Sequence, residues 1–124
     1  MASRRQSGLI RFETASFELI HWVAIVLAAV TGLVHVYLYT TQGFLLFLLA
    51  GLGFFGAIGL LLILPSLRKW LYGVGVPYTL AQIVGWYTME QPASLGDIST
   101  LALADKTVQI ALIAVLLLLF LRSN

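Results

Sequence analysis

Four long apolar runs limit what this chain can fold into. They cover residues 17–39, 44–64, 70–89 and 101–121. Each has about the 20 residues that a helix needs to cross roughly 30 Å of hydrocarbon. None alternates apolar and polar residues over about ten positions, as a transmembrane β-strand would. We therefore predict an all-α, polytopic membrane protein, an antiparallel bundle of four transmembrane helices.

The composition excludes most soluble classes of protein. The chain has 124 residues, of which 60% are hydrophobic and 10% charged, whereas an average soluble domain has about 25% charged residues. A soluble chain this short buries only about 60–70% of its surface and could not hide so much apolar area. We exclude a soluble globular enzyme, a disordered chain and a nucleic-acid binder. The absence of cysteine excludes disulfides and thiolate metal sites.

Short polar connections separate the runs. Gly43 is a helix-stop residue, Pro65 interrupts the second helix, and Ser99 with Thr100 is an N-cap for the last one. Residues 1–16 are predicted to form a cytoplasmic N-terminal segment, and residues 17–124 the four-helix membrane domain. The first apolar run is too long for a signal peptide, so we expect a retained helix.

Basic residues predict the orientation of the bundle. Positively charged side chains gather in cytoplasmic loops, and with four spans six of the seven Lys and Arg residues fall on one side. They are Arg4, Arg5, Arg11, Arg68, Lys69 and Arg122. The opposite loops carry Glu90 and Asp97. We predict a cell-membrane protein with both termini in the cytoplasm.

Small residues in the second run indicate close helix packing, because membrane helices approach each other most closely at such positions. The glycines are Gly51, Gly53, Gly56 and Gly59. They favour packing inside the bundle, although a face for a second copy or the lining of a small pore remains an alternative. In the third run, Pro77 is expected to kink the helix.

Polar residues within the apolar runs form a candidate site. Such residues face protein or a cavity, because exposing them to lipid is costly. Five of them fall in the outer half of the bundle: His35, Tyr78, Gln82, Asp105 and Gln109. Asp105 and Gln109 share a helix face, as do Tyr78 and Gln82. We expect Lys106 to point elsewhere, towards the outer headgroups.

This predicted cluster has two interpretations. It is either a polar pocket open to the outside, in which a His35–Asp105 pair accepts a proton, or a set of structural hydrogen bonds between helices. The spacing of His21 and His35 resembles that of haem ligands on one helix, but no third histidine is present. No enzyme motif occurs. We therefore predict no catalytic residue, no metal and no cofactor.

Three sequence segments carry a resemblance to a known family. They are GLGFFGAIGL at Gly51–Leu60, VGVPYTLAQIVGWY at Val74–Tyr87 and LALADKTVQI at Leu101–Ile110. They resemble small four-helix membrane proteins of halophilic archaea, a family with no assigned function. The resemblance implies a multi-pass membrane protein and attaches no chemistry to these segments.

Two functions follow from these observations as hypotheses. The first is a membrane protein without enzymatic activity that serves as an accessory, interaction or structural subunit. The alternative is a small oligomeric transporter or channel that uses the outer polar cluster of His35, Gln82, Asp105 and Gln109. The expected partners are the lipid bilayer and either further copies of the chain or other membrane subunits, but no nucleic acid.

Overall fold

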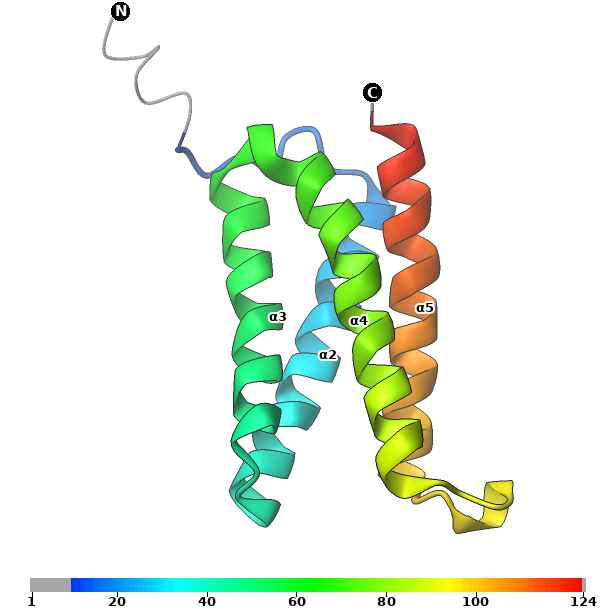
Figure 1. Ribbon diagram of the computed structural model, residues 1–124. Helices are drawn as coiled ribbons and strands as arrows, with labels where there is room; N and C mark the ends of the chain where they lie inside the picture. The colour runs from blue at the N-terminus through cyan, green and yellow to red at the C-terminus, as the bar shows by residue number, and fades with distance from the viewer. Residues whose placement is uncertain (1–9, 124) are drawn as a thin grey trace, which may run out of the picture.

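The computed structural model describes residues 10–123. Its long helices are α2 (Leu19–Gln42), α3 (Leu45–Ile63), α4 (Arg68–Glu90) and α5 (Thr100–Arg122). Two short 3₁₀ helices, η1 (Pro65–Leu67) and η2 (Leu95–Asp97), lie in the connections. The long helices run up and down side by side (Figure 1). The all-α prediction is confirmed for the described residues, and each predicted range overlaps one long helix.

The connections form where the sequence predicted them. Gly43 ends α2 in a left-handed conformation with φ 73°, and its N–H donates to Tyr39 O at 2.8 Å. Pro65 opens η1. Ser99 caps α5, since its Oγ accepts a hydrogen bond from Ala102 N at 3.1 Å. Tyr39 O and the N–H of Ala102 belong to the backbone groups that helix ends leave without intrahelical partners.

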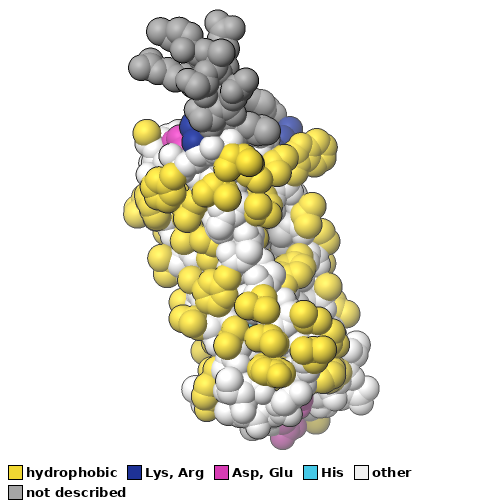
Figure 2. Space-filling model, turned by 90° about the vertical axis from the view of Figure 1, so that its left-hand side faces the viewer, with side chains coloured by type: hydrophobic (Ala, Val, Ile, Leu, Met, Phe, Trp, Pro, Cys, Tyr) yellow, Lys and Arg dark blue, Asp and Glu magenta, His cyan; other side chains and the backbone are white. Residues whose placement is uncertain are grey.

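Three of the helices, α2, α3 and α5, are long and apolar enough to cross a membrane. Helix α4 has 23 residues and so matches them in length, but glycine, proline, tyrosine and tryptophan take the place of many aliphatic side chains in it. Figure 2 shows hydrophobic side chains along the face of the bundle on the α3 side, with charged side chains visible only near its two ends. A surface of this kind suits contact with lipid along the middle of the bundle.

The charged residues separate between the two ends of the bundle. Arg68 and Lys69 follow η1, and Arg122 Nη2 pairs with Glu18 Oε1 at 2.6 Å beside the start of α2. Glu90 and Asp97 lie at the opposite end, near η2. We term the η1 end the inner end and the η2 end the outer end, after the predicted orientation. Arg4 and Arg5, which also entered that prediction, lie outside the described residues.

At the inner end, Arg68 holds the segment that precedes α2. Its Nη1 pairs with Glu13 Oε2 at 2.9 Å, its Nε donates to Leu61 O at 2.8 Å, and its guanidinium lies 4.4 Å from the centroid of the Phe17 ring. The backbone N–H of Glu13 donates to Leu62 O at 3.0 Å. One arginine thus ties the start of α2 to the end of α3.

Two glycines of α3 mark close approaches to neighbouring helices. A Cβ added at Gly51 would lie 2.8 Å from Gly32 O, which is a backbone atom of α2. A Cβ at Gly53 would collide with the hydroxyl of Tyr78 on α4. These two glycines therefore serve different neighbours, α2 and α4.

The prediction of packing inside the bundle is wrong for Gly56 and Gly59. A Cβ added at either glycine meets no described atom within 4 Å. At about 100° of rotation per residue, the four glycines of α3 spread around the helix and cannot share one face. The close contact between α4 and α5 uses Gly73 and Gly75 instead, which lie against Phe120 and Leu116.

The inner half of the bundle has an apolar core. Its buried hydrophobic side chains come from all four long helices and are Ala24, Phe54, Leu61, Tyr72, Leu112 and Leu119. The buried polar side chains lie in the outer half of the bundle or near the middle of the bundle.

Pro77 lies inside α4 and does not end this helix, which continues to Glu90.

The Glu13–Arg68 contact predicts a dependence of stability on pH. The hydrogen bond from Ser16 N and the Arg68 guanidinium lower the pKa of Glu13 from 4.5 to about 2. Because the folded state favours the carboxylate, its contribution is present above pH 4.5 and is lost as the pH falls towards about 2. Glu13→Gln should lower the melting temperature in detergent at neutral pH and flatten its decline in acid. Glu18→Gln, at a more exposed ion pair, should leave both nearly unchanged; identical acid profiles for the wild type and Glu13→Gln would contradict the assignment.

The glycine contacts predict opposite outcomes for two matched substitutions. Gly51→Ala should lower the free energy of unfolding by about 1–3 kcal/mol, because α2 and α3 must move apart to admit the methyl group. Gly56→Ala should leave stability unchanged or raise it by up to about 1 kcal/mol, since the added methyl group meets no atom and alanine favours a helix. Thermal unfolding in detergent measures both. Equal losses at the two sites would show that Gly56 also packs against protein.

Candidate functional site

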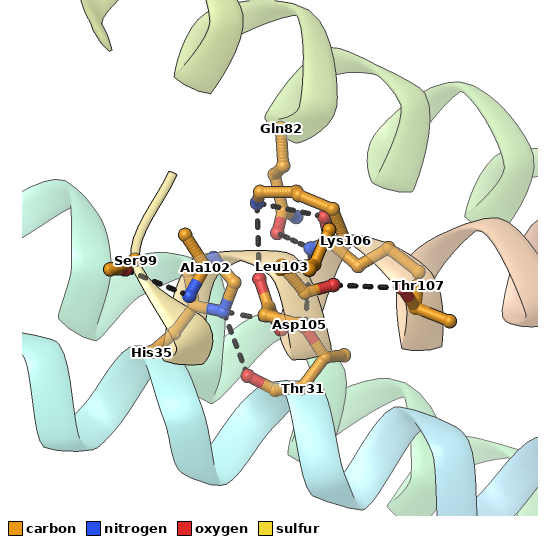
Figure 3. Close-up of polar contacts among 10 residues, drawn as sticks. Thr31, His35, Gln82, Ser99, Ala102, Leu103, Asp105, Lys106 and Thr107 are labelled. Atoms are coloured by element: carbon orange, nitrogen blue, oxygen red, sulfur yellow. Dashed lines mark hydrogen bonds and ion pairs between the residues drawn. The ribbon is translucent and has the colours of Figure 1, made fainter. Parts of the chain in front are cut away.

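A polar cluster lies in the outer half of the bundle, where α2, α4 and α5 meet (Figure 3). Its members are linked by hydrogen bonds or an ion pair and are Thr31, His35, Gln82, Asp105, Lys106 and Gln109. Asp105 is the sixth residue of α5, which places it beyond the first turn. Its position therefore needs an explanation other than the helix dipole.

Thr31 joins α2 to α5. Its Oγ1 donates to Asp105 Oδ1 at 2.7 Å and accepts a hydrogen bond from Gln109 Nε2 at 3.1 Å. Thr31 and Gln109 are fully buried, and Asp105 is 3% exposed. One hydroxyl thus uses its hydrogen for the carboxylate and a lone pair for the amide.

Lys106 neutralises the buried carboxylate. Its Nζ lies 3.0 Å from Asp105 Oδ2 and 3.0 Å from Gln109 Oε1, with its side chain 11% exposed. It also lies 5.6 Å from the centroid of the Trp86 ring, within range of a cation–π contact. The prediction that Lys106 points away from the cluster is wrong. Its flexible stem turns back towards the cluster, because pairing with the ammonium group lowers the free-energy cost of burying the Asp105 carboxylate.

The ammonium group also fixes the orientation of both glutamine side chains. Since Lys106 Nζ can only donate, it bonds the oxygen of Gln109. Gln109 Nε2 is then the donor to Gln82 Oε1, at 3.0 Å. The Nε2 of Gln82 is left with no acceptor, and the atom is buried.

His35 joins the cluster through Thr31 and has no direct bond to Asp105. Its Nδ1 lies 2.7 Å from Thr31 O, and because a carbonyl only accepts, Nδ1 carries the hydrogen. The Nε2 of the neutral ring is then an acceptor, and it has no hydrogen-bond partner among residues 10–123. The predicted His35–Asp105 pair is therefore corrected to two side chains that Thr31 connects.

Tyr78 lies outside the cluster, although it shares a helix face with Gln82. Its hydroxyl donates to Ala50 O at 2.8 Å, across to α3. Its ring meets Phe54 edge-on, with the ring centroids 5.2 Å apart. Tyr78 thus connects α4 to α3, whereas the cluster connects α4 to α5 and α2.

A cleft opens between α3 and α4 towards the outer end of the bundle. It has a volume of about 580 Å³, and the two helices diverge towards this end in Figure 1. Its walls are mainly apolar and aromatic, with Phe47, Tyr78 and Trp86 among them. The cluster residues that reach its wall are His35, Gln82, Asp105 and Lys106. Glu90 and Asp97 also line it.

The remaining histidine has a structural position. Nδ1 of His21 accepts a hydrogen bond from Glu18 N at 2.9 Å, and its ring stacks on Phe17 at 4.9 Å. This contact caps the start of α2. Residues 10–123 contain no group of three or more His, Cys, Asp or Glu side chains placed to hold a metal ion.

The structure thus brings together four of the five predicted residues and adds two. Thr31 was missed because threonine is common in apolar spans and carries no charge. Its position four residues before His35, on the same face of α2, was the available signal. Lys106 was assigned to the wrong side, because a fixed helix face does not limit a long side chain.

The Asp105–Lys106 pair predicts strong coupling between two substitutions. Asp105→Asn or Lys106→Met alone should lower the free energy of unfolding by about 3–5 kcal/mol, since each leaves the other charge buried and unpaired. The double variant should lose less than the sum of the two, because no charge then remains. A double-mutant cycle from unfolding in detergent measures the difference. Strictly additive losses would contradict the pairing.

Comparison with known proteins gives a family for the chain. No curated protein and no solved structure matches it. The model of a family described as "Family of unknown function (DUF7475)" matches residues 7–120, which include every residue of the polar cluster. The chain belongs to this DUF7475 family.

Proposed function

We propose that the protein is a four-span membrane protein without enzymatic activity that serves as an accessory or interaction subunit. The observation that carries this proposal is that the buried charges of the polar cluster are paired with each other. Asp105 is paired with Lys106 and bonded to Thr31, so the buried charges serve each other. The cluster then acts as a structural link between α2, α4 and α5.

The contacts of α4 support its assignment as the fourth span. Its Gly73 and Gly75 lie against α5, and its Gln82 bonds Gln109. These three small or polar residues of α4 are directed at the bundle, while Val74 and Val84 are exposed. The resemblance to small four-helix membrane proteins of halophilic archaea agrees with four spans.

The position of the Thr31 hydroxyl supports the absence of catalysis. Its hydrogen points to the carboxylate of Asp105 at 2.7 Å, but the side chain is fully buried, so no substrate reaches it. A nucleophile has to contact its substrate as well as a base.

One observation favours a transporter as the second candidate, and one weighs against it. Four cluster residues reach the wall of a cleft that opens at the outer end. Between the cluster and the inner end, however, the core is filled by apolar side chains such as Leu61, Tyr72 and Leu119. A continuous polar path would need these helices to separate, so the accessory role is the simpler proposal.

Three measurements on the full chain test this proposal. Single cysteines at Gln42→Cys and Ser94→Cys should be labelled from outside intact cells, and labelling only after the membrane is opened would overturn the orientation.

Native mass spectrometry after mild extraction should show a complex larger than the 13.6 kDa chain. Reconstituted vesicles should show no proton flux above empty vesicles. A flux that Asp105→Asn abolishes would establish the transporter instead.

A further inference from the structure

We propose that the cleft between α3 and α4 binds a neutral amphipathic molecule, an alkyl or isoprenoid chain that ends in a hydroxyl group. The inference does not depend on the accessory role, because it concerns what fills this cleft in a single chain. It is carried by the size of the cleft, the chemistry of its walls and two unpartnered polar atoms beside it.

The size and walls of the cleft suit a small apolar molecule. Its volume of about 580 Å³ falls within the roughly 300–1,000 Å³ of ligand sites, and it is far too small for a partner helix of about 10 Å diameter. Aliphatic side chains such as Leu38 and Leu49, with the aromatic rings of Phe47 and Trp86, form most of the lining. An extended hydrocarbon chain would replace water along these walls.

Two polar atoms beside the cleft ask for a partner that the described chain does not supply. His35 Nε2 is an acceptor without a donor, and Gln82 Nε2 is a donor without an acceptor. Gln82 Nε2 is fully buried, and leaving it unpaired is costly. His35 Nε2 is not fully enclosed, so it is the atom that a molecule in the cleft can reach. Both residues line the cleft, from α2 and α4 respectively. A hydroxyl group is a small neutral group that can donate to His35 Nε2.

The charges around the cleft favour a neutral ligand. Three carboxylates, of Glu90, Asp97 and Asp105, face a single ammonium group, that of Lys106. This excess of negative charge opposes fatty acids and phospholipid phosphates. The only deep carboxylate, Asp105, is already neutralised by Lys106, so a cation would find no free counter-charge at the inner end of the cleft.

Quenching of Trp86 fluorescence tests the proposal. The variant Trp22→Phe/Trp70→Phe keeps Trp86 as the only tryptophan of the three. It is placed in phospholipid nanodiscs and titrated at alkaline pH with bromododecanol, bromododecanoate or bromododecyl-trimethylammonium, each brominated at the chain end. We expect bromododecanol to quench saturably and to bind about tenfold more tightly than either charged probe, a difference of about 1.4 kcal/mol.

A pair of matched substitutions tests whether the probe lies in the cleft. Gly85 lines the cleft and Gly56 does not, and a Cβ at either meets no described atom within 4 Å. Gly85→Leu should fill the cleft and weaken binding by about tenfold or more, whereas Gly56→Leu should change it by less than about twofold. Binding that resists Gly85→Leu would overturn the proposal, because the probe would then lie elsewhere.

The hydroxyl contact has its own test. His35→Leu removes Nε2 while keeping an apolar side chain of similar bulk, so bromododecanol should bind at least about threefold more weakly, while the charged probes should change by less than about twofold. Equal saturable quenching by all three probes in the unsubstituted cleft would identify a site for any acyl chain and overturn the assignment of a neutral head group. Quenching that rises linearly without saturation, or a cleft closed in a dimer, would also overturn it.

Discussion

A carboxylate inside an apolar span must be neutralised and hydrogen-bonded by the protein, because the surrounding lipid offers neither a charge nor a donor. In this chain Lys106, Thr31 and Gln109 meet that requirement for Asp105, directly or through one another. Their bonds fix the rotation of α5 and bring α2 and α4 to it. The geometry of the outer half follows from this one buried charge.

Helix α3 takes no part in the polar cluster, and its contacts differ accordingly. It meets α2 through the backbone approach at Gly51 and meets α4 through the hydroxyl of Tyr78. At the inner end Arg68 holds the α3–α4 connection against the segment before α2. Because α3 packs mainly against α2 and α4 packs mainly against α5, the two helices part towards the outer end. The cleft is the space that this unequal attachment leaves.

The fold was largely predictable from the sequence because the signals for it are local. Apolar length sets each helix, and Gly43, Pro65 and Ser99 end or begin helices through their own backbone or side-chain chemistry. The glycines of α3 show where local reasoning stops. The sequence shows where a neighbouring helix could approach α3 closely, but which neighbour each glycine meets depends on the placement of α2 and α4. Gly51 meets a backbone and Gly56 meets no described atom.

The polar cluster was predictable only in part, for a related reason. Burial of Asp105 and Gln109 follows from the cost of exposing them to lipid, and this cost is the same in any arrangement of the helices. The partners of the carboxylate do depend on the arrangement of the helices, because Thr31, Lys106 and His35 can each donate a hydrogen bond to it. Thr31 reaches it at 2.7 Å and leaves His35 only the backbone carbonyl of the same residue. That outcome turns Nε2 of His35 away from the network as a free acceptor. The bond from Thr31 to Asp105 and the unpartnered Nε2 of His35 are thus two results of one competition for this carboxylate.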